Sequence, residues 1–163
     1  MKLTTKEQEA LYRILKEYKE NAPDNEYYND YYNDYIQPVS KKVINSILKK
    51  ISSQLPKEIK KEIDKDFLRR KYHPFNNEIN ERAYSVIEKG FSQNRTVEIK
   101  YFNMKRAEFI KRKINVYYKS RRYVIAYCHL RKAIRKFRAS RIASAKLTDK
   151  KYKIPRDFDK NKY

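Results

Sequence analysis

Residues 121–148 of the chain read RRYVIAYCHLRKAIRKFRASRIASAKLT, and this stretch decides the fold class. Its first part, RYVIAYC at residues 122–128, is an almost continuous apolar run, which is typical of a strand buried on both faces. Residues 134–142 and 143–147 are expected to form two further strands after short basic links. The stretch therefore predicts a sheet of short strands.

The same two-residue period begins earlier in the chain. Between residues 96 and 102, Val97, Ile99 and Tyr101 alternate with charged residues. Between residues 109 and 118, one strand face receives Ile110, Arg112, Ile114 and Val116. Five short antiparallel strands suggest a small barrel, because closure removes exposed sheet edges.

The N-terminal part of the chain has helical spacing instead. Thr4 is placed to cap a first helix, and Glu7 completes a capping box three residues later. Further helices are expected at residues 38–55 and 57–68, and after Asn77. Gly90 is expected just past the end of the fourth helix, where a left-handed residue is needed. The predicted fold class is α+β.

The segment at residues 69–75, which contains His73-Pro74, is expected to link a helical region at residues 1–75 to a strand-rich region at 76–150, and residues 151–163 are expected to form a polar, loose tail. A tyrosine-rich tract, DNEYYNDYYNDY at residues 24–35, has two interpretations. It is either a loop whose tyrosines cover neighbouring surface or a platform on which bases stack. The first is favoured, because the four acidic side chains of the tract would repel phosphate.

Positive charge is concentrated in the strand-rich half. The chain has a net charge of +21, of which residues 1–80 carry +3 and residues 81–163 carry +18. The densest window, residues 105–141, holds 14 basic side chains and one acid, Glu108. Like charges packed together repel, and a polyanionic partner relieves that repulsion. Nucleic acid is the favoured partner, with another anionic ligand or plain surface charge as alternatives.

The arginines of this half alternate with tyrosines and phenylalanines. Arginine offers a planar fork that matches phosphate oxygens, and tyrosine offers a face on which bases stack. Arg112 shares a strand face with Ile114, and Arg135 shares one with Phe137. An arginine among apolar neighbours is costly unless it is paired. Each of these two arginines is therefore either paired with an acid or directed into a ligand pocket, and the sequence leaves both open.

Features that would indicate catalysis, a metal or a membrane are missing. Cys128 and His129 are neighbours on one strand, so they point to opposite faces and form no nucleophile–base pair. One cysteine and two histidines make no zinc framework, and a single glycine excludes glycine-rich phosphate loops. No apolar run is long enough to cross a bilayer. We expect a protein of the reducing cytoplasm that is no enzyme and needs no cofactor or metal.

Residues 121–148 resemble the WYL domain of bacterial transcriptional regulators. The tripeptide that names the family falls on residues 122–124, where only Tyr123 is kept. The segments RTVEIKYFN (95–103) and FIKRKINVYY (109–118) are similar to the first two strands of that domain, with Arg112 at its usual arginine. Other positions that follow the family pattern are Tyr101, Ala126, Arg131, Arg135, Phe137, Arg138, Arg141 and Ile142.

The resemblance implies an Sm-like, SH3-type five-stranded barrel at residues 76–150. It also implies a helical linker and dimerisation region at 1–75, and the start of a C-terminal extension at 151–163. The family's ligand face maps to Tyr101, Arg112, Tyr123, Arg131, Arg135 and Arg138, with His129 beside them. Core packing is the alternative role of Tyr101 and Tyr123.

The function expected from the resemblance is regulatory. The barrel would bind single-stranded DNA or RNA and report it to a tethered winged helix-turn-helix domain, which is expected to lie outside this chain. A homodimer is the expected assembly. The alternatives are a sensor of a small anionic, nucleotide-type effector, or a protein-interaction or CRISPR accessory module.

Overall fold

The computed structural model describes residues 3–21, 39–73, 75 and 77–163 of the 163-residue chain. The tyrosine-rich tract at 24–35 lies outside these residues. The chain forms two compact units, Met1–Asp64 and Lys65–Tyr163, and each is considered by itself.

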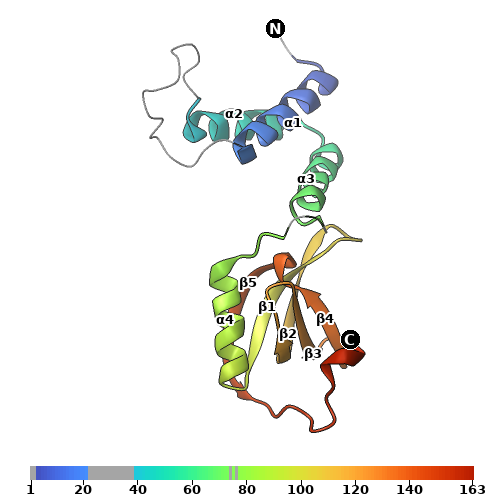
Figure 1. Cartoon of the computed structure of the whole chain (residues 1–163). Helices are drawn as coiled ribbons and strands as arrows, with labels where there is room; N and C mark the ends of the chain where they lie inside the picture. Colours follow the sequence, from blue (N-terminus) through green and yellow to red (C-terminus); the bar gives the residue numbers. More distant parts are fainter. Residues whose placement is uncertain (1–2, 22–38, 74, 76) are drawn as a thin grey trace. The chain divides into compact units, whose positions relative to one another are not determined.

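The first unit contains α1 (Thr5–Asn21), α2 (Lys41–Gln54) and the start of α3 (Lys57–Lys71) (Figure 1). The predicted capping box is confirmed, since the main-chain N–H of Thr4 donates to Glu7 at 2.7 Å and that of Glu7 donates to the Thr4 hydroxyl at 3.4 Å. The cap of α2 is Ser40, whose hydroxyl accepts from the N–H of Val43. The helix thus begins slightly later than predicted.

The phenol and ammonium groups of α1 reach one carboxylate of α3. The Tyr12 hydroxyl donates to Asp64 at 3.0 Å, and Lys16 Nζ lies 2.6 Å from the same oxygen. Desolvation by burial, followed by the contact with Asp64, raises the pKa of Tyr12 to about 12. These contacts join the start of α3 to α1.

The second unit contains the end of α3, the helix α4 (Glu81–Ser92) and an antiparallel sheet of five strands. The strand order is β4-β3-β2-β1-β5. The strands are β1 (Arg95–Asn103), β2 (Glu108–Lys119), β3 (Tyr123–Cys128), β4 (Ala133–Arg138) and β5 (Ile142–Lys151). Helices followed by this sheet confirm the α+β class.

The predicted closure into a barrel is wrong: β4 and β5 are the two edges of the sheet, and no ladder joins them. A short 3₁₀ helix, η1 (Ala139–Arg141), ends β4 where the prediction continued a strand to residue 142. β5 then pairs with β1 at the far side of the sheet. Among the residues that the structure describes, β4 therefore pairs with β3 alone, and the sheet stays open.

Helix α4 covers one face of the sheet, and we call this face the α4 face. Ala83 and Ile87 of the helix form one buried cluster with Val97, Ile99 and Ile114 of the strands. In Figure 1, α4 runs alongside β1 and β5. Two ion pairs, between Lys119 and Glu88 and between Arg121 and Glu81, tie the helix to the end of β2 and the link after it.

Two sequence predictions for α4 are wrong. Its cap is Asn80 rather than Asn77: the side-chain oxygen of Asn80 accepts from the N–H of Ala83 at 3.0 Å, and its amide donates to the carbonyl of Ala143 at 3.0 Å. Gly90 lies buried inside the helix and not past its end. The left-handed residue is Asn94, with φ 50°. Gly90 is required for close packing against the sheet.

The C-terminal tail packs on the sheet, in contrast to the loose tail expected from its composition. Tyr152 donates from its hydroxyl to the carbonyl of Val116. The ring of Phe158 lies 5.2 Å from that of Tyr117, and Lys136 Nζ donates to the main-chain oxygen of Tyr163 at 2.7 Å. The tail therefore contributes aromatic side chains to the fold of the second unit.

Candidate functional site

The strongest candidate for a binding residue is Arg112, in the middle of β2. Alternation along the strand places it on the α4 face with Ile110 and Ile114, and only 8% of its surface is exposed. Within the described residues no carboxylate lies at ion-pair distance from it. One guanidinium nitrogen, Nη1, lies 3.6 Å from Cys128 Sγ, and the buried Nε has no hydrogen-bond partner. A buried guanidinium in this state is costly unless a ligand pairs with it.

Arg112 lines a pocket of about 400 Å³ at one end of the sheet. Two hairpin turns form the rest of the wall, because the β1–β2 and β3–β4 turns of an up-and-down sheet lie at the same end. The lining residues are Asn103, Arg106, Glu108, Ile110, Arg112, Leu130 and Arg131. The pocket therefore combines apolar walls with several polar groups, as ligand sites commonly do.

Local backbone geometry fixes both turns. Asn103 Oδ1 accepts from the N–H groups of Lys105 and Arg106, at 3.0 and 3.3 Å. Ala107 and Lys132 both adopt φ 50°, the left-handed conformation that reverses a hairpin. These turns set the positions of Arg106 and Arg131 beside Arg112.

The pocket carries more positive than negative charge. Three guanidinium groups face one carboxylate, that of Glu108, which lies 3.5 Å from Arg106 Nη1. Arg106 and Arg131 are exposed, whereas Arg112 is buried. The arrangement suits an anion that reaches the buried arginine and contacts the two exposed ones.

Residues 82–147 match the model of the WYL domain family. The match confirms the WYL resemblance over this part of the chain, which we call the WYL region and which contains the whole pocket.

Among solved structures, the chain is similar to the proteasome accessory factor B/C (PafBC) of Arthrobacter aurescens. The alignment has 17% sequence identity and a TM-score of 0.39, and it covers 93% of this chain and 21% of that one. The chain thus spans about a fifth of the length of PafBC. No curated protein matches the chain.

The seven residues predicted for the ligand face do not form one group in the WYL region. Arg112 and Arg131 line the pocket. Tyr101 is half-buried on the same face. Its ring is nearly perpendicular to that of Phe137, with 5.2 Å between the ring centroids, and its hydroxyl accepts from the N–H of Arg138 at 3.3 Å. Arg135, opposite Ala126 on the edge strand, is exposed and outside the pocket lining.

Tyr123 and His129 belong to the opposite face of the sheet. Two cations lie over the ring of Tyr123: the guanidinium carbon of Arg122 is 5.4 Å from the ring centroid, and Lys136 Nζ is 5.0 Å from it. His129 Nε2 lies 3.0 Å from Asn115 Oδ1. Burial, followed by the charges of Lys150 and Lys113, lowers the pKa of His129.

Arg138 pairs across β4 with Tyr123, and its Nη2 donates to Asn77 at 3.1 Å. Neither Tyr123 nor Arg138 lines the pocket.

Five pocket residues were not among the predicted site residues: Asn103, Arg106, Glu108, Ile110 and Leu130. A sequence signal for one of them exists. Arg106 lies in the turn between two predicted strands, and an up-and-down order brings that turn to the same end of the sheet as the turn holding Arg131. Turn positions have no periodicity, so strand-face arguments alone pass over them.

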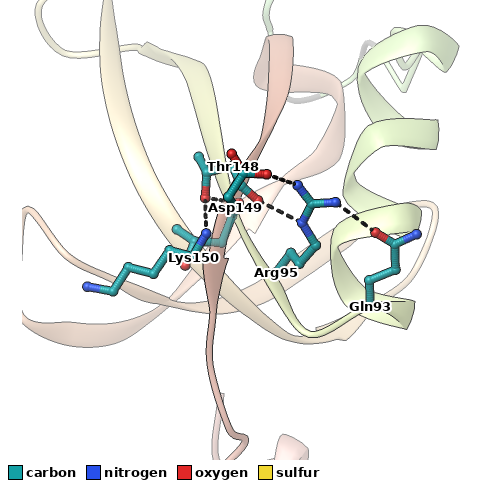
Figure 2. Close-up of polar contacts among 6 residues, drawn as sticks. Gln93, Arg95, Thr148, Asp149 and Lys150 are labelled. Atoms are coloured by element: carbon teal, nitrogen blue, oxygen red, sulfur yellow. Dashed lines mark hydrogen bonds and ion pairs between the residues drawn. The ribbon is translucent and has the colours of Figure 1, made fainter.

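A second arginine of the WYL region, Arg95, differs from Arg112 because its guanidinium group has oxygen acceptors within the protein. Arg95 donates from Nε to the carbonyl of Thr148 at 2.8 Å, from Nη2 to Asp149 at 2.6 Å and from Nη1 to Gln93 at 3.2 Å (Figure 2). Lys150 extends away from this group in the same view. Arg95 joins α4, β1 and β5, whereas Arg112 has none of these oxygen acceptors.

The described residues contain no group of three or more metal-ligating side chains that could hold an ion. Among these same residues, no helix has the length and apolar character needed to cross a bilayer.

Proposed function

We propose that this chain is a ligand-sensing, regulatory part of a bacterial transcriptional regulator, and that its pocket binds a phosphate group of single-stranded nucleic acid. The observation that carries the proposal is Arg112: buried, without an acid partner in the described part of the chain, and in the pocket wall. The match of residues 82–147 to WYL domains supports the regulatory role.

Phosphate suits this pocket chemically. A guanidinium donates two parallel hydrogen bonds to two phosphate oxygens, and such charge-assisted bonds are about twice as strong as neutral ones. An incoming phosphate oxygen gives the buried Nε of Arg112 a possible acceptor. Arg106 and Arg131 at the rim can contact further oxygens of the same group or of its neighbour in a chain.

A chain of nucleotides is favoured over a single effector because the cationic side chains continue beyond the pocket. Arg135 is exposed on β4, and the whole strand-rich half carries +18. Single strands are favoured over duplexes at this site because a concave pocket admits one backbone with its splayed bases. A homodimer stays part of the proposal, although the pocket does not need one to bind its ligand.

The regulatory step is a shift between two arrangements of the protein. A ligand shifts such an equilibrium only by the difference between its affinities for the two states. Binding of a phosphate to Arg112 can supply this difference in affinity, because the guanidinium has no acidic partner without the ligand and is paired with the phosphate when the ligand is bound. We also propose that the chain is no enzyme, since Cys128 is buried beside Arg112 while His129 bonds to Asn115.

Fluorescence anisotropy with a labelled ten-nucleotide single strand tests the proposal. We expect Arg112→Met and Arg131→Gln to weaken binding by tenfold or more each, and Arg82→Gln to leave it unchanged. Arg82 is a matched control because it is exposed on α4 of the same region and outside the pocket lining.

Competitors separate the alternatives. If a mononucleotide displaces the labelled strand as well as an unlabelled strand does, at the same total concentration of phosphate groups, the pocket is instead a sensor of a small anionic effector. Unchanged affinity in both pocket variants would overturn the proposed function, and would favour a protein-interaction role for the basic surface.

A further inference from the structure

The sheet face opposite α4 carries a set of lysines that the pocket does not use. Along β2, the side chains alternate between the two faces, so Ile110 and Arg112 lie on the α4 face while Lys111 and Lys113 lie on the other. β1 and β5 add two more lysines to that side. We call Lys100, Lys111, Lys113 and Lys146 the lysine band.

The strand register places these charges next to one another. Lys100 is directly opposite Lys111, and Glu98 lies between Lys113 on one side and Lys146 on the other. Directly opposite residues of an antiparallel pair have their β-carbons about 4.5–5.5 Å apart. All four lysines are exposed, and within the described parts of the chain none of them forms an ion pair.

This arrangement has a cost in the free protein. Like charges directly opposite each other destabilise a sheet, and the band has one nearby carboxylate, that of Glu98, for its four ammonium groups. Lys100 Nζ lies 4.8 Å from the centroid of the Phe109 ring. This cation–π contact offsets only part of the repulsion between the lysines. An anionic partner is the simplest compensation for the rest.

The neighbourhood of His129 supports this view independently. His129 lies on the same face as the band, and Lys113 and Lys150 lie close enough to lower its pKa, after the larger effect of burial. Charges from β2 and β5 thus act on one point of the sheet. One lysine of the band, Lys113, and one outside it, Lys150, therefore both add positive charge near His129.

Aromatic clusters close both ends of the band. The ring of Tyr72 covers Phe102 at 4.7 Å and Phe109 at 5.5 Å, and Phe158 covers Tyr117 at 5.2 Å. Their faces are used by protein contacts and do not serve as platforms for bases. The band therefore offers ammonium groups on the exposed side of the sheet, and such groups contact phosphates and do not read sequence.

We propose that the lysine band is a second nucleic-acid site, which binds the phosphodiester backbone of duplex DNA without sequence preference. The inference rests on the proposed function in one respect, that the chain acts on nucleic acid, and it does not depend on the pocket. Duplex is favoured because it presents backbone phosphates along a rigid outer surface while its bases stay stacked inside. The two faces of the sheet would then bind different nucleic acids: a single strand would bind in the pocket, and a duplex would bind to the lysine band.

The test compares two variants with the same net charge in the full chain. In the band variant, K100Q/K111Q/K113Q/K146Q, the four lysines become glutamine. In the control, K49Q/K50Q/K57Q/K61Q, four exposed lysines of α2 and α3 are changed instead. Binding to a 20-base-pair duplex and to the ten-nucleotide strand is measured by anisotropy between 50 and 300 mM salt, and circular dichroism checks that both variants are folded.

We expect the band variant to lose at least tenfold in duplex affinity at 100 mM salt. The slope of log K against log salt should fall by about 3 to 4, since each lost phosphate contact on duplex DNA reduces it by about 0.9. The control should lose less than threefold. Single-strand binding should be reduced less in the band variant than in Arg112→Met.

Each other outcome overturns one statement. If the band variant and the control lose the same amount of duplex affinity, binding depends on net charge alone, and the proposal that the lysine band is a site is overturned. Binding of polyglutamate with the same dependence on the band would assign it to acidic proteins and overturn the nucleic-acid assignment. Normal single-strand binding by Arg112→Met, with duplex binding lost in the band variant, would overturn the proposed function and leave the band standing.

Discussion

Gly90 and Val97 lie so close together that no side chain fits between them. A β-carbon at position 90 would lie 2.2 Å from Val97 Cγ2 and 3.1 Å from the carbonyl oxygen of Arg95. Val97 is fully buried on β1 and carries a stiff, branched side chain. This contact sets the distance between α4 and β1.

We expect Gly90→Ala to destabilise the second unit by about 1–3 kcal/mol, as overpacking of a core does. Alanine favours a helix over glycine by about 1 kcal/mol, which offsets part of the cost. Urea unfolding followed by circular dichroism measures the difference. In a Val97→Ala background the same change should cost clearly less, and an equal cost in both backgrounds would show that the contact is not the cause.

Arg112→Met is expected to increase stability while it weakens ligand binding. The guanidinium is buried without an acid partner in the described residues, and replacement of buried charge by an apolar side chain of similar volume is often stabilising, by about 1–4 kcal/mol. Thermal unfolding without ligand should give a higher Tm than for the wild type. A higher Tm together with weaker ligand binding is expected where a binding residue destabilises the free protein.

Arg95→Met is the matched contrast, because it removes a guanidinium that has three oxygen acceptors. It should lower Tm and leave single-strand affinity unchanged. If Arg112→Met lowers Tm as Arg95→Met does, Arg112 is a structural residue.

Local signals predicted the parts of the fold that depend on a few neighbouring residues. The capping box at Thr4 and Glu7 needs only a hydroxyl and a carboxylate three residues apart, and it is present. Apolar residues alternating along the chain predicted the central strands for the same reason. The strand face shared by Arg112 and Ile114 is likewise a local property.

The wrong predictions depend on contacts between distant residues. Asn77 and Asn80 are equally good caps by residue type, and Asn80 also bonds to Ala143 of β5, 63 positions away. Gly90 resembles a helix end in sequence, and only its approach to Val97 explains it. The pocket likewise depends on two turns meeting, so Arg106 carried no periodic signal.

The stability of the second unit should fall on acidification below about pH 6.5, the ordinary pKa of histidine. Burial, Lys150 and Lys113 lower the pKa of His129 in the folded state, so the unfolded chain binds the proton more readily. The contribution is present above the unfolded pKa and is lost as the pH falls toward the folded pKa. Urea unfolding between pH 4.5 and 8 measures it.

His129→Gln should flatten that part of the pH profile, since glutamine can still donate to Asn115 and does not titrate. Equal slopes for the wild type and the His129 variant would show that His129 is not the titrating group.

The last prediction concerns the phenol that ties the C-terminal tail to β2. The Tyr152 hydroxyl donates to the carbonyl of Val116, and burial raises the pKa of Tyr152 to about 12. Tyr152→Phe removes the donor and should cost about 1–3 kcal/mol, because a buried carbonyl then lacks its partner. Hydrogen exchange should show faster exchange at Phe158 and its neighbours.

Alkaline unfolding distinguishes this bond from simple loss of packing. The folded pKa of Tyr152 lies above the unfolded value of about 10, so its contribution is complete below pH 10 and is lost as the pH rises toward 12. Tyr152→Phe should therefore lose less stability than the wild type between pH 9 and 11.5. Tyr12→Phe, which alters the first unit, should leave exchange in the tail unchanged. If exchange near Phe158 is the same in the wild type and Tyr152→Phe, the phenol does not hold the tail.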